Sequence, residues 1–353
     1  MSALIINANA LNIPLADRSV QCVVTSPPYY GLRDYGVDGQ IGLEVTPDAY
    51  IANLVQVFRE VKRVLKDDGT LWVNIGDSYT SMKSRYNQKA QNLNGGKSQD
   101  NEFQGNKTDL YHHPELGLKD KDLIGIPWML AFALRADGWY LRQDIIWAKP
   151  NPMPESVKDR CTKSHEYIFL LSKSAKYYYD NEAVMEVATG FDGRKDTMFK
   201  GAVKSYDGVM PGGKPQSFAQ NGHERWQYKS LETGRTGEVH SGYENPDGSL
   251  RVSFDDKGVP VRNKRDVWTV TTKPYKGAHY ATFPPELITP CILAGAPEGG
   301  IVFDPFVGSG TTVATAVKLG RRGVGLDLSV KYLRENARER IYQEEMQPVL
   351  CTR

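Results

Sequence analysis

The chain has 353 residues, 40% of them hydrophobic and 24% charged, and a formal net charge of +2. This composition is typical of a water-soluble globular protein, and the length suffices for one large domain or two smaller ones. No apolar run approaches the ~20 residues that span a bilayer, and the N-terminal sequence MSALIINANA lacks the basic and apolar regions of a secretion signal. We therefore expect a cytoplasmic protein without a membrane partner.

The cysteine and histidine patterns give no sign of a metal site. The four cysteines are widely separated and include no C-x-x-C pair, which suits a reducing compartment. The adjacent pair His112-His113 lies in a polar stretch, where a zinc ion would need further ligands nearby, so a solvated loop is favoured. No metal is expected.

The N-terminal third of the chain predicts a parallel sheet. We expect strands over residues 3–7, 20–26 and 70–76, and a helix over 47–66 with apolar residues at helical spacing. Thr46 is a suitable N-cap for this helix, Pro47 suits its first turn, and Asp68-Gly69 ends it. A strand, a helix and a further strand form a unit whose sheet needs helices on both faces.

Two stretches interrupt the regular pattern in the rest of the chain. Residues 80–121 are polar and form either a functional or a disordered loop. Residues 190–265 are rich in Gly, Ser and Asp, carry scattered aromatic and basic residues, and predict a separate small module. Around them we expect helices over 123–137, 284–296, 309–320 and 330–344, and strands over 140–149, 166–174, 299–306 and 322–329, with Gly320 closing the third helix.

The sequence TSPPYY, residues 25–30, is the first stretch that predicts chemistry. Pro27 and Pro28 cannot donate to a sheet ladder, so the strand must end there. The prolines hold their carbonyl groups in fixed directions, and the ring of Tyr29 follows at once. The stretch is therefore either a rigid strand end or a slot for a flat substrate.

The sequence FDPFVGSGTT, residues 303–312, predicts a nucleoside site. A strand ends at Asp304, and Gly308 and Gly310 lead into a helix whose first N–H groups are unpaired. Asp327 follows at the end of the next strand, where an acid commonly binds the two hydroxyls of a ribose. The third glycine of a dinucleotide motif and a phosphate loop are both missing. Asp304 would repel a pyrophosphate but could bind an ammonium group, which favours S-adenosylmethionine (AdoMet).

TSPPY at 25–29 and DPFVGSGTT at 304–312 together resemble the catalytic and cofactor motifs of amino-type DNA methyltransferases. The catalytic motif comes first, as in the circularly permuted β class of that family. The resemblance implies an AdoMet-dependent, Rossmann-like α/β fold with seven mostly parallel strands and helices on both faces. It divides the chain into the two parts of a catalytic domain, 1–189 and 266–353, and a target-recognition module, 190–265.

The resemblance also implies roles for individual residues. Ser26, Pro27, Pro28 and Tyr29 correspond to the catalytic motif, in which the Pro27 carbonyl and the Ser26 side chain would hold the amino group and Tyr29 would stack on a flipped base. The cofactor residues would be Asn9, His279, Thr282, Phe283, Asp304, Pro305, Phe306, Gly308, Ser309, Gly310, Thr311, Thr312 and Asp327. Asn9 departs from the family, which often has Gly-Asp at this place.

The first motif residue bears on the target base. Family members that act on adenine usually have Asp or Asn there, and those that form N4-methylcytosine usually have Ser, so Ser26 favours cytosine N4 over adenine N6. Chemistry at cytosine C5 would need a cysteine nucleophile after proline, but Cys291 lies in a helical run and is expected in the core. Asp77, after the strand of IGDS, either lines the cleft or caps a helix.

The resulting prediction is a DNA (cytosine-N4-)-methyltransferase that uses AdoMet on double-stranded DNA, in a restriction–modification or phage setting, as a monomer or homodimer. The N6-adenine enzyme is the nearest alternative. A DNA-binding protein with an inactive methyltransferase fold and a nucleotide-dependent oxidoreductase are more distant ones.

Overall fold

The computed structural model describes residues 2–80, 117–119, 121–188, 226–229, 236–239, 253–254, 260–272 and 283–345. The chain forms two compact units, one of residues 1–183 with 265–353 and the other of 184–264. Most of the predicted polar insertion, residues 81–116 and 120, lies outside the described residues. No helix in the described part of the chain is both long and apolar enough to cross a membrane.

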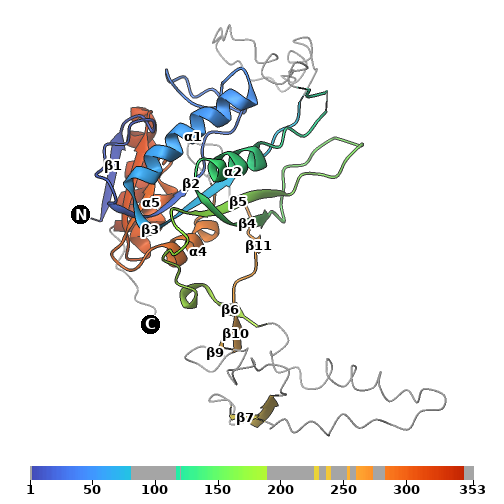
Figure 1. The fold of residues 1–353 in the computed structure, drawn as a ribbon, viewed down its shortest axis with the longest axis vertical. Coiled ribbons are helices and arrows are strands. Elements are labelled where there is room, and N and C mark those ends of the chain that lie inside the picture. Colours follow the sequence, from blue (N-terminus) through green and yellow to red (C-terminus); the bar gives the residue numbers. More distant parts are fainter. Residues whose placement is uncertain are drawn as a thin grey trace, which may run out of the picture. The chain divides into compact units, whose positions relative to one another are not determined.

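The first unit is built on one sheet of eight strands in the order β1-β13-β12-β2-β3-β5-β4-β11 (Figure 1). Their bounds are β1 Ala3–Asn7, β2 Val20–Thr25, β3 Leu65–Ile75, β4 Tyr140–Ala148, β5 His165–Ser172, β11 Val267–Thr269, β12 Ile301–Asp304 and β13 Arg322–Asp327. All neighbouring pairs are parallel except those of β5, which runs antiparallel to β3 and β4. The prediction of a mostly parallel sheet is confirmed.

The expected number of seven strands is wrong, because β11 adds an eighth at the edge. This strand has three residues and pairs in parallel with Ile146–Ala148 of β4. Three residues are too few to display a periodic pattern, so nothing in the sequence predicted this strand.

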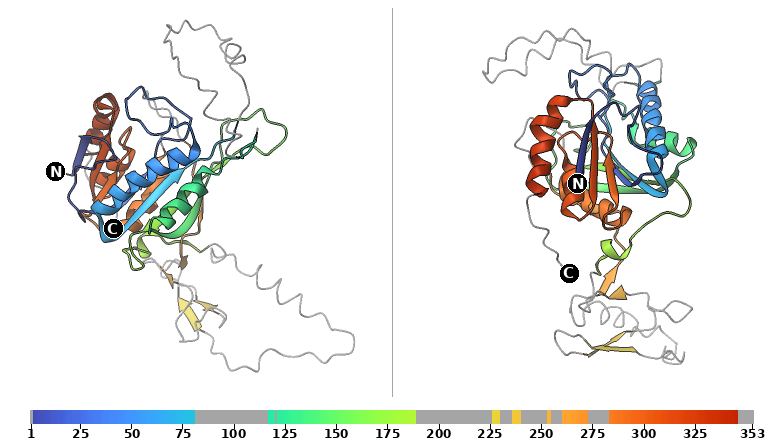
Figure 2. Two further views of the ribbon diagram at one scale, coloured as in Figure 1. Left: turned by 45° about the horizontal axis from the view of Figure 1, so that its top comes forward. Right: turned by 90° about the vertical axis from the view of Figure 1, so that its left-hand side faces the viewer.

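Helices cover both faces of the sheet (Figure 2, right). The helices α1 (Pro47–Val64) and α2 (Ile126–Ala136) pack on one face, in one core cluster with Val23, Phe303 and Val324. On the other face, α4 (Pro285–Gly295) approaches Cys22, and α5 (Thr311–Lys318) and α7 (Arg338–Glu345) form a second cluster. Adjacent strand residues alternate between the two faces, as a sheet buried on both sides requires.

The predicted helix ends are mostly confirmed. The Thr46 side chain accepts a hydrogen bond from the N–H of Ala49, so it is the N-cap of α1, and Gly320 has a φ of 76° after α5. The helix α1 ends two residues before the predicted end because β3 already starts at Leu65, which pairs with Val20 of β2. A short helix α6 (Val330–Tyr332) and a π turn (Leu333–Ala337) precede α7.

Asp77 caps a helix, which decides between the two roles that the sequence left open. Its carboxylate accepts hydrogen bonds from the backbone N–H groups of Gly125 and Ile126 at the start of α2, both at 3.0 Å. Cys291 is fully buried in α4. The expectation that it is a core residue is therefore confirmed.

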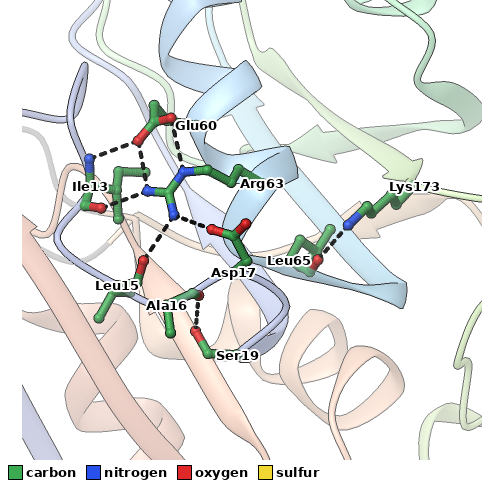
Figure 3. Close-up of polar contacts among 9 residues, drawn as sticks. All are labelled: Ile13, Leu15, Ala16, Asp17, Ser19, Glu60, Arg63, Leu65 and Lys173. Atoms are coloured by element: carbon green, nitrogen blue, oxygen red, sulfur yellow. Dashed lines mark hydrogen bonds and ion pairs between the residues drawn. The ribbon is translucent and has the colours of Figure 1, made fainter.

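Arg63 of α1 fastens the segment between β1 and β2 (Figure 3). Its guanidinium donates to the carbonyls of Ile13 and Leu15 at 2.7 and 2.9 Å and forms ion pairs with Asp17 and Glu60 at 2.6 and 2.8 Å. The Glu60 carboxylate also accepts from the N–H of Ile13 at 3.1 Å. One side chain thus holds the segment whose first residues follow β1 at the sheet edge.

Replacing this side chain is expected to cost stability. Arg63→Met leaves the Leu15 carbonyl without its donor and removes the cation that pairs with Asp17 and Glu60, so the free energy of unfolding should fall by roughly 2–3 kcal/mol in urea titrations. Arg18→Met is the matched control, because Arg18 is 69% exposed and has one ion pair at 3.5 Å; its loss should stay within about 0.5 kcal/mol. Equal losses in the two variants would contradict this role of Arg63.

The second unit contains short strands. In one sheet β10 (Pro260–Arg262) lies between β6 (Glu186–Val187) and β9 (Ser253–Phe254), and β7 (Trp226–Lys229) pairs with β8 (Thr236–Val239) in another. Both sheets are antiparallel. The one-turn segment Glu182–Val184 leads into this unit.

Candidate active site

A cavity of about 810 Å³ lies in the first unit, lined by the segments that follow β2, β12 and β13. These strands are neighbours and parallel, so their carboxyl ends meet at one edge of the sheet, where open α/β sheets bind ligands. The lining includes the predicted residues Asn9, Ser26, Pro27, Pro28, Tyr29, Phe283, Asp304, Pro305, Phe306, Gly308, Ser309, Thr311 and Asp327. Both predicted motifs therefore border one space. The predicted residues His279 and Thr282 lie outside the described residues.

Asp304 presents a buried carboxylate to the cavity. It is 2% exposed and accepts hydrogen bonds from the hydroxyls of Thr25 and Thr312, both at 2.6 Å, and from the N–H of Phe306 at 3.0 Å. Burial raises the pKa of Asp304 to about 6, although these hydrogen bonds oppose the shift. A cation bound beside this carboxylate would recover part of the free energy that burying its charge costs.

Asp327 ties the turn after β12 to the end of β13. Its carboxylate accepts hydrogen bonds from the N–H of Gly308 at 3.0 Å and from the N–H of Ser329 at 2.8 Å. Burial raises its pKa above the ordinary value. The group still lines the cavity, so it can accept hydrogen bonds from hydroxyl groups of a ligand there.

Gly310 and Thr312 belong to the predicted cofactor set but are absent from the cavity lining. Gly310 is the N-cap of α5, with a φ of 82°, and a Cβ there would lie 3.0 Å from the Cα of Ala337. The Thr312 hydroxyl binds the Asp304 carboxylate instead of facing the cavity. Both residues thus act on the site indirectly: Gly310 starts α5, and Thr312 holds the Asp304 carboxylate.

Arg340 is a residue of this site that the sequence did not reveal. Its guanidinium, on α7, donates to the hydroxyls of Ser309 and Thr311 at 3.1 and 2.6 Å. The two hydroxyls, predicted to contact the cofactor, are held by this arginine from the far end of the chain. A terminal helix with mixed charges carries no signal for the contact.

The close approach of α5 to the π turn yields a stability prediction. In Gly310→Ala, alanine must adopt the positive φ of this position, which is strained for it, and its Cβ lies against Ala337. The free energy of unfolding should therefore fall by about 2–4 kcal/mol in urea titrations. Gly299→Ala controls for the strain alone, because Gly299 has a φ of 71° and no atom within 4 Å of its Cβ position. It should lose only about 1 kcal/mol. Equal losses would show that the approach to Ala337 is unimportant.

The SPPY segment is fixed by a residue of α1. The Tyr50 hydroxyl donates to the Pro28 carbonyl at 2.7 Å, and its ring lies 5.5 Å from that of Tyr30, which is buried. The sequence assigned both prolines to the catalytic set. The Pro28 carbonyl, however, already has a donor within the protein, the Tyr50 hydroxyl. The Pro27 carbonyl and the Ser26 hydroxyl, which itself donates to Tyr29, remain as the acceptors that this segment can offer a ligand.

Tyr29 lies among polar residues of three further strands. Its hydroxyl donates to Glu166 of β5 at 2.7 Å, and Asn74 of β3 and Lys149, just after β4, also bind this carboxylate. All four side chains line the cavity. Burial and the nearby Glu166 raise the pKa of Tyr29 well above its ordinary value. The sequence assigned neither Lys149 nor Glu166 a role.

Asn9 and Tyr35 complete the lining on the side of the N-terminal loops. The Asn9 side-chain oxygen accepts from the N–H of Leu11 at 2.9 Å, which leaves its amide NH₂ to contact an adenine edge. The ring of Tyr35 packs edge-on against Tyr332, 6.1 Å away, and both line the cavity.

These residues fit AdoMet. The cavity has the size of a small-molecule site. It offers a buried carboxylate for an ammonium group at Asp304, a carboxylate at a strand end for ribose hydroxyls at Asp327, and the apolar side chains of Pro305 and Phe306 for an adenine ring. The arrangement is that of an AdoMet-dependent methyltransferase.

Residues 20–338 match the family N6_N4_Mtase, described as DNA methylase. The chain belongs to this family; it is a methyltransferase that acts on DNA with AdoMet as methyl donor. It is 44% identical to the type II methyltransferase M.Cfr9I of Citrobacter freundii, with 90% of this chain and 80% of the relative covered, and 43% identical to M.SmaI of Serratia marcescens, with 91% and 83% covered.

Two solved structures share the fold. The PvuII DNA methyltransferase, named cytosine-N4-specific, superimposes with a TM-score of 0.54 at 14% identity and covers 98% of this chain and 91% of its own. TTHA0409 of Thermus thermophilus, a putative DNA modification methylase complexed with AdoMet, superimposes with a TM-score of 0.51 at 20% identity and covers 98% and 94%. At these identities the likeness supports the fold alone.

Proposed function

We propose that this protein is a type II modification enzyme that methylates the N4 amino group of a cytosine flipped out of duplex DNA. The observation that carries the proposal is Ser26, a neutral hydroxyl beside the Pro27 carbonyl at the wall of the cavity that Asp304 and Asp327 also line. The type II names of relatives above 40% identity support the setting. The order of the motifs, with residues 25–29 before 304–312, supports the circularly permuted β class.

The slot activates an amino group by positioning it. The lone pair of an aromatic amino group is delocalised into the ring, so its two N–H bonds must be held in directions that return the lone pair to nitrogen. The Pro27 carbonyl accepts one N–H and Ser26 accepts the other, while Tyr50 keeps the following proline in place through its carbonyl. AdoMet, when bound, would supply a methyl group from a positively charged sulfur, and the methylated nitrogen would release one of its two protons. The rate gain then comes from orientation and fixed dipoles.

The target base must leave the helix to reach this slot. A stacked cytosine cannot bring its amino group to the Pro27 carbonyl inside a cavity, so the base flips, at a cost of a few kcal/mol. The unit of residues 184–264 is our candidate for the module that recognises the DNA sequence, because it is separate from the catalytic unit and carries basic and aromatic residues. We propose double-stranded DNA as the substrate.

The proposal is tested by identifying the product base. The enzyme is incubated with unmethylated duplex DNA and AdoMet that carries a labelled methyl group, and the DNA is digested to nucleosides and separated. Label in N4-methyldeoxycytidine is expected. Label only in N6-methyldeoxyadenosine would establish the adenine enzyme instead, and no label at all would revive the inactive DNA-binding alternative.

A further inference from the structure

The polar residues around Tyr29 form a connected cluster, which we call the Glu166 cluster: Tyr29, Asn74, Lys149 and Glu166. The carboxylate of Glu166 accepts from Tyr29 Oη at 2.7 Å and from Asn74 Nδ2 at 3.3 Å on one oxygen, and from the Lys149 ammonium on the other. The side chains of Glu166 and Lys149 are 15% and 17% exposed. The members come from four adjacent strands or from the segments that follow them. Asn74 lies in β3 and Glu166 in β5, while Tyr29 follows β2 and Lys149 follows β4.

This cluster is more than a stabilising ion pair. A half-buried ion pair often gains little over apolar packing, because both charges lose their hydration. Here the pair lies at the wall of the cavity and its carboxylate is directed at the hydroxyl of the tyrosine in the catalytic motif. Lys149 also lies 4.2 Å from the ring centroid of Trp147, so its position is fixed from two sides.

Gly76 lies against the edge of the same tyrosine ring, close to Glu166. A Cβ on Gly76 would lie 2.8 Å from Cε2 of Tyr29 and 3.5 Å from Cδ of Glu166. Because Gly76 has no side chain, the edge of the Tyr29 ring lies close against the Gly76 backbone. The Tyr29 ring is thus held at two points, its edge against Gly76 and its hydroxyl at Glu166, and it still lines the cavity.

We infer that Glu166 is a positioning residue, which clamps the Tyr29 ring in the orientation that receives the flipped base, with Lys149 balancing its charge and Gly76 supporting the ring edge. The inference rests on the proposed function, in which Tyr29 stacks on the base. A ring that is already ordered loses no further rotational freedom when the base arrives, so stacking on it is stronger than on a mobile ring. None of the predicted cofactor residues belongs to this cluster.

A double-mutant cycle between Tyr29 and Glu166 tests the inference. Glu166→Ala and Tyr29→Phe each remove the same hydrogen bond, so each should lower kcat for methyl transfer by about 10-fold to 30-fold. The double variant should be no slower than the slower single variant. Affinity for AdoMet, measured by calorimetry, should stay within twofold. Rate losses that multiply in the double variant would overturn the inference, because the two residues would then act independently.

The orientation of the ring has its own spectroscopic signature. A fluorescent cytosine analogue at the target position should be quenched when it stacks on Tyr29, and Glu166→Ala should relieve this quenching while Glu166→Gln, which retains an acceptor for the hydroxyl, should restore most of it. Gly76→Ala displaces the ring through the added Cβ and removes neither partner of the ion pair, and should reproduce the loss of quenching. Unchanged quenching in both Glu166→Ala and Gly76→Ala would contradict the inference, even if one variant folds poorly.

Glu60→Gln is the matched control. Glu60 is also paired with a basic side chain and is 25% exposed, but it is not part of the cavity lining. Its variant should lose stability and leave kcat and quenching unchanged. Rates are measured as total label transferred to DNA, so the cycle decides the role of Glu166 even if the product proves to be methyladenine and the proposed base is wrong.

Discussion

Asp304→Asn is expected to weaken AdoMet binding by about 30-fold to 100-fold, which is the value of a charge-assisted hydrogen bond that the neutral amide cannot make. The isolated variant should nevertheless be at least as stable as the wild type at pH 8. Weaker binding without a loss of stability is expected because Asp304 is buried. Burial makes its negative charge costly in the protein without ligand, which is why the pKa is raised to about 6. Calorimetric titration gives the affinity, and urea unfolding gives the stability.

The same pKa determines how both quantities depend on pH. Because the folded-state pKa is raised from 3.8 to about 6, Asp304 contributes stability that is fully present below pH 3.8 and is lost as the pH rises through 6. The loss amounts to roughly 3 kcal/mol. The stability advantage of Asp304→Asn over the wild type should therefore grow from pH 4 to pH 7. AdoMet affinity of the wild type should fall as the pH drops below about 6, since the ammonium group binds the ionised form.

A variant at a neighbouring acid separates this effect from a general loss of charge. Asp77→Asn also removes a carboxylate after a strand of the sheet, but Asp77 caps α2 and does not line the cavity. It should lose stability and retain AdoMet affinity. If Asp304→Asn bound AdoMet as tightly as the wild type at pH 8, Asp304 would not be the residue that binds the ammonium group.

Ser26→Ala is expected to lower kcat by about 100-fold, because the hydroxyl holds one of the two N–H bonds of the amino group in the transition state. Loss of an interaction made in the transition state lowers kcat without weakening substrate binding, so the KM for DNA and the Kd for AdoMet should stay within about threefold. Single-turnover transfer of labelled methyl groups measures the chemical step directly.

Ser19→Ala is a suitable control for the loss of one hydroxyl. The Ser19 hydroxyl binds the carbonyl of Ala16 at 2.7 Å, in the segment between β1 and β2, and does not line the cavity. Its kcat should equal that of the wild type. A Ser26→Ala enzyme with more than half of the normal kcat would mean that the Pro27 carbonyl alone orients the amino group.

The sequence predicted the parts of the site that local chemistry determines. Prolines must end β2 wherever it packs, and Gly308 and Gly310 both have the positive φ that only glycine adopts easily, 47° and 82°. The strands before these two segments, β2 and β12, are parallel neighbours, so their carboxyl ends meet at one edge and both segments border the cavity. Apart from β11 and the π turn within the last predicted helix, the predicted order of strands and helices in the first unit agrees with the structure.

The partners of these motifs depend on packing, which the sequence does not display. Glu166 meets Tyr29 because β5 runs antiparallel to β3 and β4, which sets Glu166 opposite Trp147 and close to Lys149. Tyr50 and Arg340 reach the motifs from helices whose positions follow from the whole core. Asp77 followed a strand as Asp304 does, and only the position of α2 shows that it caps a helix.

The most direct test of the account is a crystal structure of the enzyme with a non-reactive AdoMet analogue and a DNA duplex that contains its recognition site. We expect one cytosine outside the helix, in the cavity, with N4 within about 3 Å of the Pro27 carbonyl oxygen and of Ser26 Oγ, its ring stacked on Tyr29, and the ammonium group of the analogue beside Asp304. A target base that remains stacked in the duplex, or an amino group turned away from the Pro27 carbonyl, would contradict the account.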